Sequence, residues 1–81
     1  MRRSKLPQTP FAKRLEKARI AFGRRIGRDD FTWKDFAAML GLRASTYSRY
    51  EVGFVEPNLR MLAKIRAVTG VSLNYLITGK P

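Results

Sequence analysis

The chain contains no cysteine and no histidine, and each absence removes a class of chemistry. Without cysteine no disulfide can form, and the common zinc-binding clusters cannot be assembled without either residue. Acid–base catalysis by histidine is excluded in the same way. The six acidic residues mostly occupy helix-cap and helix-surface positions and offer no catalytic pair. We therefore expect neither an enzyme nor a cofactor, and no metal site.

Long apolar runs are also missing. The longest extend over only a few residues, so no segment is expected to span a membrane. Residues 1–7 are basic but have no apolar stretch behind them, which argues against a secretory signal. A cytoplasmic location is the resulting expectation, and a length of 81 residues fits one small domain.

Acidic residues are scarce. Seventeen lysines and arginines face six aspartates and glutamates, which gives a net charge of +11, and ten of the cations lie in residues 1–28. A positive field concentrated in this way attracts a polyanion. Nucleic acid is the first candidate partner, and nonspecific attraction to nucleic acid or to an anionic membrane surface is the alternative.

Apolar residues recur at helical spacing, and no segment keeps the two-residue period of a strand. The predicted fold class is therefore all-α, with five helices and no internal repeat. Thr9 is the expected N-cap of the first helix, which begins at Pro10 and extends to about Ile26. Its apolar stripe consists of Phe11, Leu15, Ala18, Phe22 and Ile26.

Two short helices joined by a glycine turn follow. Thr32 is the expected N-cap of the first, Asp35 completes a capping box with it, and Gly41 ends the helix. The second is predicted over residues 44–52 and ends at another glycine. The aromatic side chains expected in the core are those of Phe36, Tyr47 and Tyr50.

Asn58 and Ser72 are expected to cap two further helices, each of which ends at a glycine. Residues 1–8 are basic and lack apolar periodicity, so they are predicted to form a flexible arm. The folded domain is accordingly predicted over residues 9–81.

Five segments stand in order along residues 11–79: FAAMLGL at 36–42, STYSRYEVG at 45–53, EPNL at 56–59, LAKI at 62–65 and GVSLNYLITG at 70–79. In this order and spacing they resemble the phage repressor and Cro-like helix-turn-helix domains, also called the XRE family. The resemblance implies a compact five-helix domain that binds DNA.

The resemblance also implies that residues 44–52 form the recognition helix and lie in the major groove. The positions then expected at base edges are Arg43, Ala44, Ser45, Ser48 and Arg49. Arg49 can present its planar fork to the O6 and N7 acceptors of guanine. The two serine hydroxyls can bond to bases or phosphates, whereas Ala44 can only touch a thymine methyl group or leave space.

Contacts to the DNA backbone are expected from Thr32, Trp33 and Thr46. For Trp33 the alternative is a packing role over the connection between the first two helices. A second basic cluster and the arm supply further candidates: Arg24, Arg25, Arg28, Arg2, Arg3 and Lys5. The arm can enter a minor groove or add only a nonspecific field.

The chain departs from the family pattern in three places. The connection between the first two helices is extended by residues 21–30, which include three arginines and two aspartates. Trp33 stands where the family often has glutamine, and Arg43 stands where it often has a serine or threonine cap. The loop after the recognition helix carries Phe54 and Val55 where the family often has basic residues.

An apolar pair beside a groove-binding helix predicts a dimer contact. Phe54 and Val55 are the first candidates and Tyr75 is another, while the alternative is that Phe54 folds back onto the core. The predicted function is a sequence-specific regulator of transcription, a repressor of phage or mobile-element type, bound as a homodimer to a pseudo-palindromic double-stranded operator. The alternative is an antitoxin or adaptor that binds a small protein partner as well as DNA.

Overall fold

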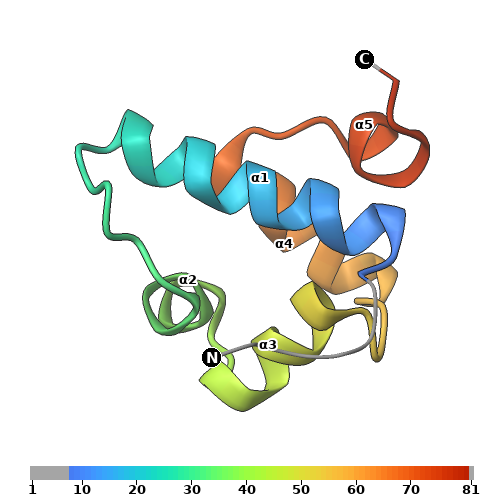
Figure 1. Ribbon diagram of the computed structural model, residues 1–81, viewed down its shortest axis with the longest axis horizontal. Helices are drawn as coiled ribbons and strands as arrows, with labels where there is room; N and C mark the ends of the chain where they lie inside the picture. The colour runs from blue at the N-terminus through green and yellow to red at the C-terminus, as the bar shows by residue number, and fades with distance from the viewer. Residues whose placement is uncertain (1–7, 81) are drawn as a thin grey trace.

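Five helices make up residues 8–80, the part of the chain that the computed structural model describes. They are α1 (Pro10–Arg25), α2 (Trp33–Leu40), α3 (Ala44–Val52), α4 (Leu59–Thr69) and α5 (Leu73–Thr78) (Figure 1). No strand occurs within these residues, and the all-α prediction is confirmed. The Cα radius of gyration is 11.9 Å, close to the ~12 Å expected of a folded chain of this length.

The ends of the helices follow the local signals in the sequence. Thr9 Oγ1 accepts a hydrogen bond from the backbone N–H of Ala12 at the start of α1, and Gly27 takes a positive φ of 79° just beyond its end. Ile26 was predicted to extend the apolar stripe, but this is wrong because Ile26 lies past the last helical residue and is exposed. The buried members of the stripe are Leu15, Ala18 and Phe22.

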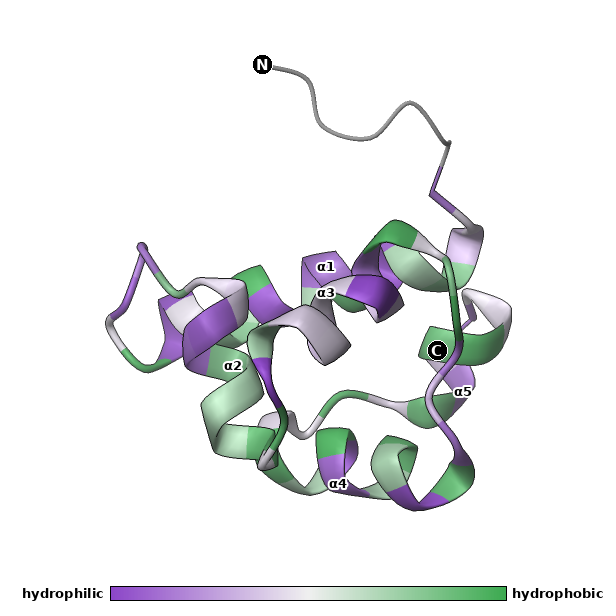
Figure 2. Ribbon diagram, turned by 90° about the horizontal axis from the view of Figure 1, so that it is seen from below, coloured by the Kyte–Doolittle hydropathy of each residue, from purple (hydrophilic) through white to green (hydrophobic). Residues whose placement is uncertain are grey.

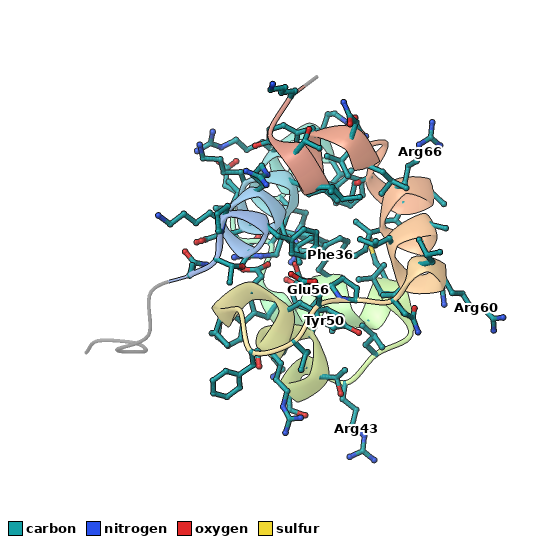
Figure 3. All side chains as sticks on the ribbon, turned by 90° about the vertical axis from the view of Figure 1, so that its right-hand side faces the viewer. Phe36, Arg43, Tyr50, Glu56, Arg60 and Arg66 are labelled. Carbon is teal, nitrogen blue, oxygen red and sulfur yellow. The ribbon has the colours of Figure 1, made fainter. Side chains whose placement is uncertain are left out.

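Helix α1 contacts α3, α4 and α5, while α2 contacts α3 and α4. Phe36 lies among these helices (Figure 3) and forms an edge-to-face contact with Tyr47, with ring centroids 5.1 Å apart. Phe31 continues the aromatic cluster at 5.9 Å from Phe36. Tyr47 is fully buried as predicted, whereas Tyr50 is half-buried and packs against the edge of the core.

Two arginines of α1 hold the ends of other helices. Arg14 donates to the carbonyl oxygens of Leu76 and Ile77, at 2.9 and 3.0 Å, at the end of α5. Arg25 donates to the carbonyl oxygen of Thr69, at 3.1 Å, at the end of α4. A cation at a helix C-terminus satisfies free carbonyls and complements the helix dipole, so α1 stabilises α4 and α5.

Gly23 brings the connection between α1 and α2 close to α1. A Cβ atom at this position would stand 2.5 Å from Phe31 Cβ and 2.7 Å from the carbonyl oxygen of Arg28, so only glycine permits the approach. The N–H of Arg28 in turn donates to the carbonyl oxygen of Gly23. The predicted extension over residues 21–30 is therefore divided, because its first part continues α1 and the remainder folds back. Hydrophilic and hydrophobic segments alternate along the loop that connects α1 to α2 (Figure 2).

The predicted capping box of α2 is present. The backbone N–H of Thr32 donates to Asp35 Oδ2 at 2.9 Å, and Thr32 Oγ1 accepts from the N–H of Asp35. These hydrogen bonds lower the pKa of Asp35: the backbone bond contributes most and the Thr32 hydroxyl next, with help from the charge of Arg28. The carboxylate of Asp35 is thereby favoured in the folded state.

Replacing Asp35 with asparagine is expected to lower the melting temperature at neutral pH. A lowered pKa stabilises the fold fully above the unfolded value of about 3.8, and this stabilisation is lost as the pH falls through the lower folded value. The difference in melting temperature between the two proteins should therefore shrink towards about pH 2. Circular dichroism melts across this range test the prediction, and a difference that stays constant with pH would contradict it.

Candidate nucleic-acid interface

The turn between α2 and α3 is built by one glycine and its neighbours. Gly41 adopts the left-handed conformation at φ 75°, which residues with a side chain rarely tolerate. The next N–H, that of Leu42, donates to the carbonyl oxygen of Ala37 at 2.8 Å and closes the end of α2. Arg43 then occupies the N-cap position of α3 without a side-chain capping bond. The two helices lie on the side of the domain opposite α5 (Figure 1).

Helix α3 has one exposed side and one buried side. The predicted base-contacting residues on the exposed side are Arg43, Ser45 and Arg49, and the half-buried ones are Ala44 and Ser48. Thr46 is also half-buried. The Arg43 side chain projects away from the domain (Figure 3). Ser48 Oγ donates to the carbonyl oxygen of Ser45 at 3.0 Å, so its hydroxyl hydrogen is engaged and its lone pairs remain available as acceptors.

The buried side of α3 carries a carboxylate that the sequence did not single out. The Glu51 side chain is only 3% exposed. It accepts hydrogen bonds from Arg19 Nε at 2.7 Å, Arg19 Nη2 at 3.2 Å and Trp33 Nε1 at 3.2 Å, and from the Tyr47 hydroxyl. We call these four residues the Glu51 cluster. They join α1, α2 and α3.

The charges in the Glu51 cluster compensate one another. Burial by itself would lower the pKa of Arg19, but the hydrogen bond to Glu51 and its negative charge raise the pKa above the ordinary value. Burial raises the pKa of Tyr47, and the neighbouring Glu51 carboxylate raises it further. These shifts favour the cationic form of Arg19 and the neutral, donating form of Tyr47, and both residues pair with the carboxylate.

Trp33 is turned towards the protein. Its N–H, which could have bonded a phosphate, donates to Glu51. Its indole lines an open cleft of about 590 Å³ together with Ile20 and residues 28–32 of the connection. Trp33 thus lies against the connection between α1 and α2, as the alternative to a phosphate contact proposed, and the side of its indole that faces solvent leaves the residue 39% exposed.

The predicted second basic cluster consists of Arg24, Arg25 and Arg28, and the three side chains have different partners. Arg25 is directed to the end of α4 and lies over the Phe22 ring. Arg28 pairs with Asp30 at 3.1 Å and with Asp35 at 3.0 Å, and these carboxylates raise its pKa, Asp30 most. The Arg24 side chain is exposed and makes no hydrogen bond within residues 8–80, although its backbone carbonyl accepts from the N–H of Gly27. The cluster is therefore not a single cationic patch.

Two exposed lysines, one at the start of α2 and one beside the turn, were not among the predicted contact residues. Lys34 is the second residue of α2 and is exposed. Lys64 comes from α4, and its Nζ would be 3.4 Å from a Cβ placed on Gly41, so it lies beside the turn. The position of Lys34 one residue into the capped helix was a usable signal. The proximity of Lys64 depends on the packing of α4 and could not be read from local sequence.

Phe54 is 63% exposed and Val55 is also exposed, so the alternative that Phe54 folds back onto the core is wrong. A cleft of about 260 Å³ lies nearby and is lined mainly by apolar side chains, those of Phe11, Pro57, Leu62 and Ile77, with Glu56 at its edge. Tyr75, the other predicted dimer contact, is half-buried and packs against the core.

The arm cations Arg2, Arg3 and Lys5 lie outside the described residues. Gln8, which was predicted to end the flexible arm, is instead anchored. Its Nε2 donates to the carbonyl oxygen of Glu51 at 2.6 Å and to Glu16 Oε1 at 3.1 Å. Gln8 therefore links the start of the described chain to α1 and α3.

A family model described as helix-turn-helix matches residues 24–76, which is more than half of the chain. The chain belongs to the helix-turn-helix family. This membership confirms the resemblance seen in the ordered segments. The family consists of DNA-binding regulators and not of enzymes.

Several curated helix-turn-helix proteins are similar to the chain. It is 33% identical over 69 residues to the SPbeta prophage-derived uncharacterized HTH-type transcriptional regulator YonR of Bacillus subtilis (strain 168), covering 85% of this chain and 57% of YonR. It is 44% identical over 46 residues to an uncharacterized HTH-type transcriptional regulator of Haemophilus influenzae, covering 57% of this chain and 19% of that protein. It is 37% identical over 49 residues to YqaE of Bacillus subtilis, an uncharacterized HTH-type transcriptional regulator, covering 60% of this chain and 42% of YqaE.

The helix-turn-helix chain thus spans 57% or less of the length of these relatives. No solved structure matches it significantly. Within residues 8–80, no helix has the length and apolar character needed to cross a membrane. The family match begins at Arg24, so the first part of α1, with Arg19, comes from outside the matched region.

Proposed function

We propose that this helix-turn-helix protein is a sequence-specific regulator of transcription that binds double-stranded DNA with α3 in the major groove. The observation that carries the proposal is the two-sided character of α3. Small polar side chains and arginines are exposed on one side, while Tyr47 and Glu51 fix the other side to the core. The relatives named above are HTH-type transcriptional regulators, which supports the same role.

The exposed side of α3 suits base contacts. Ser45 and Ser48 are short enough to let the helix approach the floor of the groove. Arg49 can form a bidentate contact with guanine. Because the Ser48 hydroxyl hydrogen is held by the carbonyl of Ser45, Ser48 would act as an acceptor, which suits the amino groups of cytosine or adenine.

The ends of neighbouring elements suit contacts to the DNA backbone. The N-terminus of α2, next to Thr32, presents free N–H groups and a positive helix dipole. Lys34 lies at the start of α2, and Lys64 of α4 lies beside the turn at the end of α2. Together they would place phosphates along the length of α2 and orient α3 in the groove.

The proposed regulator acts as a repressor of phage or mobile-element type, because one of its relatives is prophage-derived and a small groove-binding domain can block a promoter simply by occupying it. Selection of bound fragments from random and genomic DNA at physiological salt tests sequence specificity. We expect a pseudo-palindromic consensus. Absence of any enrichment would overturn the proposal.

Replacing Arg49 with alanine is expected to remove the preference at one base position of each half-site. A bidentate arginine–guanine pair contributes about 1–3 kcal/mol of discrimination, so affinity for the preferred base should fall to that for the other three. Arg66→Ala is the matched control, because Arg66 is also an exposed arginine on a helix but projects from the opposite end of the domain to Arg43 (Figure 3). An unchanged base profile in Arg49→Ala would show that Arg49 makes no base contact.

The dimer that the function requires would form through the exposed Phe54 and the adjacent cleft. A projecting aromatic side chain beside an apolar cleft is self-complementary, so a second copy related by a two-fold axis could place its Phe54 in this cleft and receive the other in return. Val55 would extend the contact, while the half-buried Tyr75 would have a smaller share.

Phe54→Asp is expected to abolish dimers in solution and to weaken binding to a two-half-site operator more than binding to a single half-site. Ile26→Asp is the control, because Ile26 is also an exposed apolar residue but lies at the end of α1. Analytical ultracentrifugation of the free and DNA-bound proteins gives the measurement. A wild-type protein that is monomeric in both states would remove the dimer from the proposal.

A further inference from the structure

We propose that Trp33 is a positioning residue for base recognition, which acts through Glu51 to hold α3 at a fixed angle to α2. The inference rests on the proposed DNA-binding function and assigns the role to a residue that does not itself contact a base. It starts from the bond between Trp33 Nε1 and Glu51 Oε1, which measures 3.2 Å.

This bond connects the far ends of the helix-turn-helix. The C-terminal end of α2 and the N-terminal end of α3 are joined by the turn at residues 41–43. Trp33 is the first residue of α2 and Glu51 is the penultimate residue of α3. The two helices are thus joined at one end by the turn and at the other end by this hydrogen bond.

Arg19 reinforces this second connection from α1. Its Nε and Nη2 hold Glu51, while its Nη1 donates to the carbonyl oxygen of Phe31 at 2.7 Å, two residues before Trp33. The guanidinium of Arg19 thus donates both to the segment just before α2 and to the last turn of α3. Trp33 adds the direct link between the two helices.

A fixed angle matters more for base contacts than for phosphate contacts. Arg49 lies two residues before Glu51 on α3, and a bidentate pair with guanine tolerates only small displacements. Lysine contacts to phosphates are tolerant of position and carry no sequence information directly. A looser connection between α2 and α3 should therefore reduce specific binding while nonspecific binding is retained.

Trp33 is the member of the Glu51 cluster at which this role can be tested. Arg19 is 11% exposed at its side chain and Tyr47 is fully buried, so changing either one alters the core. Trp33 is 39% exposed, and Trp33→Phe removes the N–H while keeping an aromatic ring. Glu51 would retain the donors from Arg19 and Tyr47.

The experiment compares the affinity of wild type, Trp33→Phe and Ile20→Ala for the selected operator and for a scrambled duplex of equal length. Ile20 is the control because it is also 39% exposed and lines the same cleft, but as an aliphatic residue it has no donor for Glu51. We expect Trp33→Phe to reduce operator affinity on the order of tenfold and to leave affinity for the scrambled duplex unchanged. Ile20→Ala should leave the ratio of the two affinities at the wild-type value.

Two results would overturn the inference. An equal reduction in affinity for both duplexes would mean that Trp33 contacts the DNA backbone directly, and unchanged affinity for both would mean that the bond to Glu51 does not affect binding. A second measurement uses the double variant with Arg49→Ala. If Trp33 acts by positioning Arg49, the effect of Trp33→Phe on the operator must shrink in that background, and full additivity contradicts it. A wild-type protein that binds both duplexes equally would instead refute the proposed function.

Discussion

Replacing Arg19 with methionine is expected to destabilise the domain by about 3–5 kcal/mol, the usual effect of removing one partner of a buried ion pair. Methionine keeps most of the aliphatic stem but none of the donors. Glu51 would lose two hydrogen bonds and the one cation that pairs with it within residues 8–80, and the carbonyl oxygen of Phe31 would lose the bond from Arg19 Nη1. A small domain is stable by about 5–15 kcal/mol in total, so the loss is a large part of the free energy of unfolding.

Urea denaturation followed by circular dichroism measures this change. Arg24→Met is the control, because Arg24 is an exposed arginine near the end of the same helix. Adding Glu51→Gln to Arg19→Met should recover part of the loss, since an amide leaves no uncompensated charge in the interior. A loss below about 1 kcal/mol, the range of exposed ion pairs, would show that solvent reaches the Glu51 cluster.

Operator affinity is expected to fall about a thousandfold or more between ~50 and ~200 mM salt if a dimer engages about six to ten phosphates. Each copy would then neutralise about three to five phosphates. The exposed cations beside α2 and α3 are suitably placed for this, and they include Lys34, Arg43 and Lys64. The slope of log affinity against log salt, measured by fluorescence anisotropy, gives the number of phosphates.

Lys34→Ala should reduce this slope by about one for each copy bound, and Arg66→Ala should leave it unchanged. A shallow slope with sequence preference intact would mean that base contacts supply most of the affinity. A steep slope that Lys34→Ala does not change would place the phosphate contacts elsewhere on the domain, with the arm as the first alternative.

Most of the fold could be predicted because its signals are local. The caps at Thr9, Thr32, Asn58 and Ser72 all accept the backbone N–H expected of them. A cap acts over three residues and a left-handed glycine over one, so each can be recognised without knowing the tertiary structure. Ile26 shows the limit, because apolar spacing alone does not reveal that a helix has just ended.

The Glu51 cluster could not be predicted in the same way. Arg19 and Glu51 are 32 positions apart in sequence, and nothing in the local pattern distinguishes this glutamate from a solvated one on the helix surface. The N-terminal charge was misleading for the same reason. Arg19 and Arg28 pair with carboxylates, and Arg14 and Arg25 are held at the ends of other helices, so the excess of cations in residues 1–28 overstates how many side chains are free to contact DNA.

The contacts made by α1 determine the smallest fragment that can be transplanted into another protein. The match to the family model begins at Arg24. However, Phe31 packs closely against Gly23, Arg19 pairs with Glu51, and Arg14 donates to the end of α5. A chimera that borrows only the matched segment would carry α2 and α3 without the residues of α1 that hold them in place. Domain boundaries for grafting should therefore be placed ahead of Gln8.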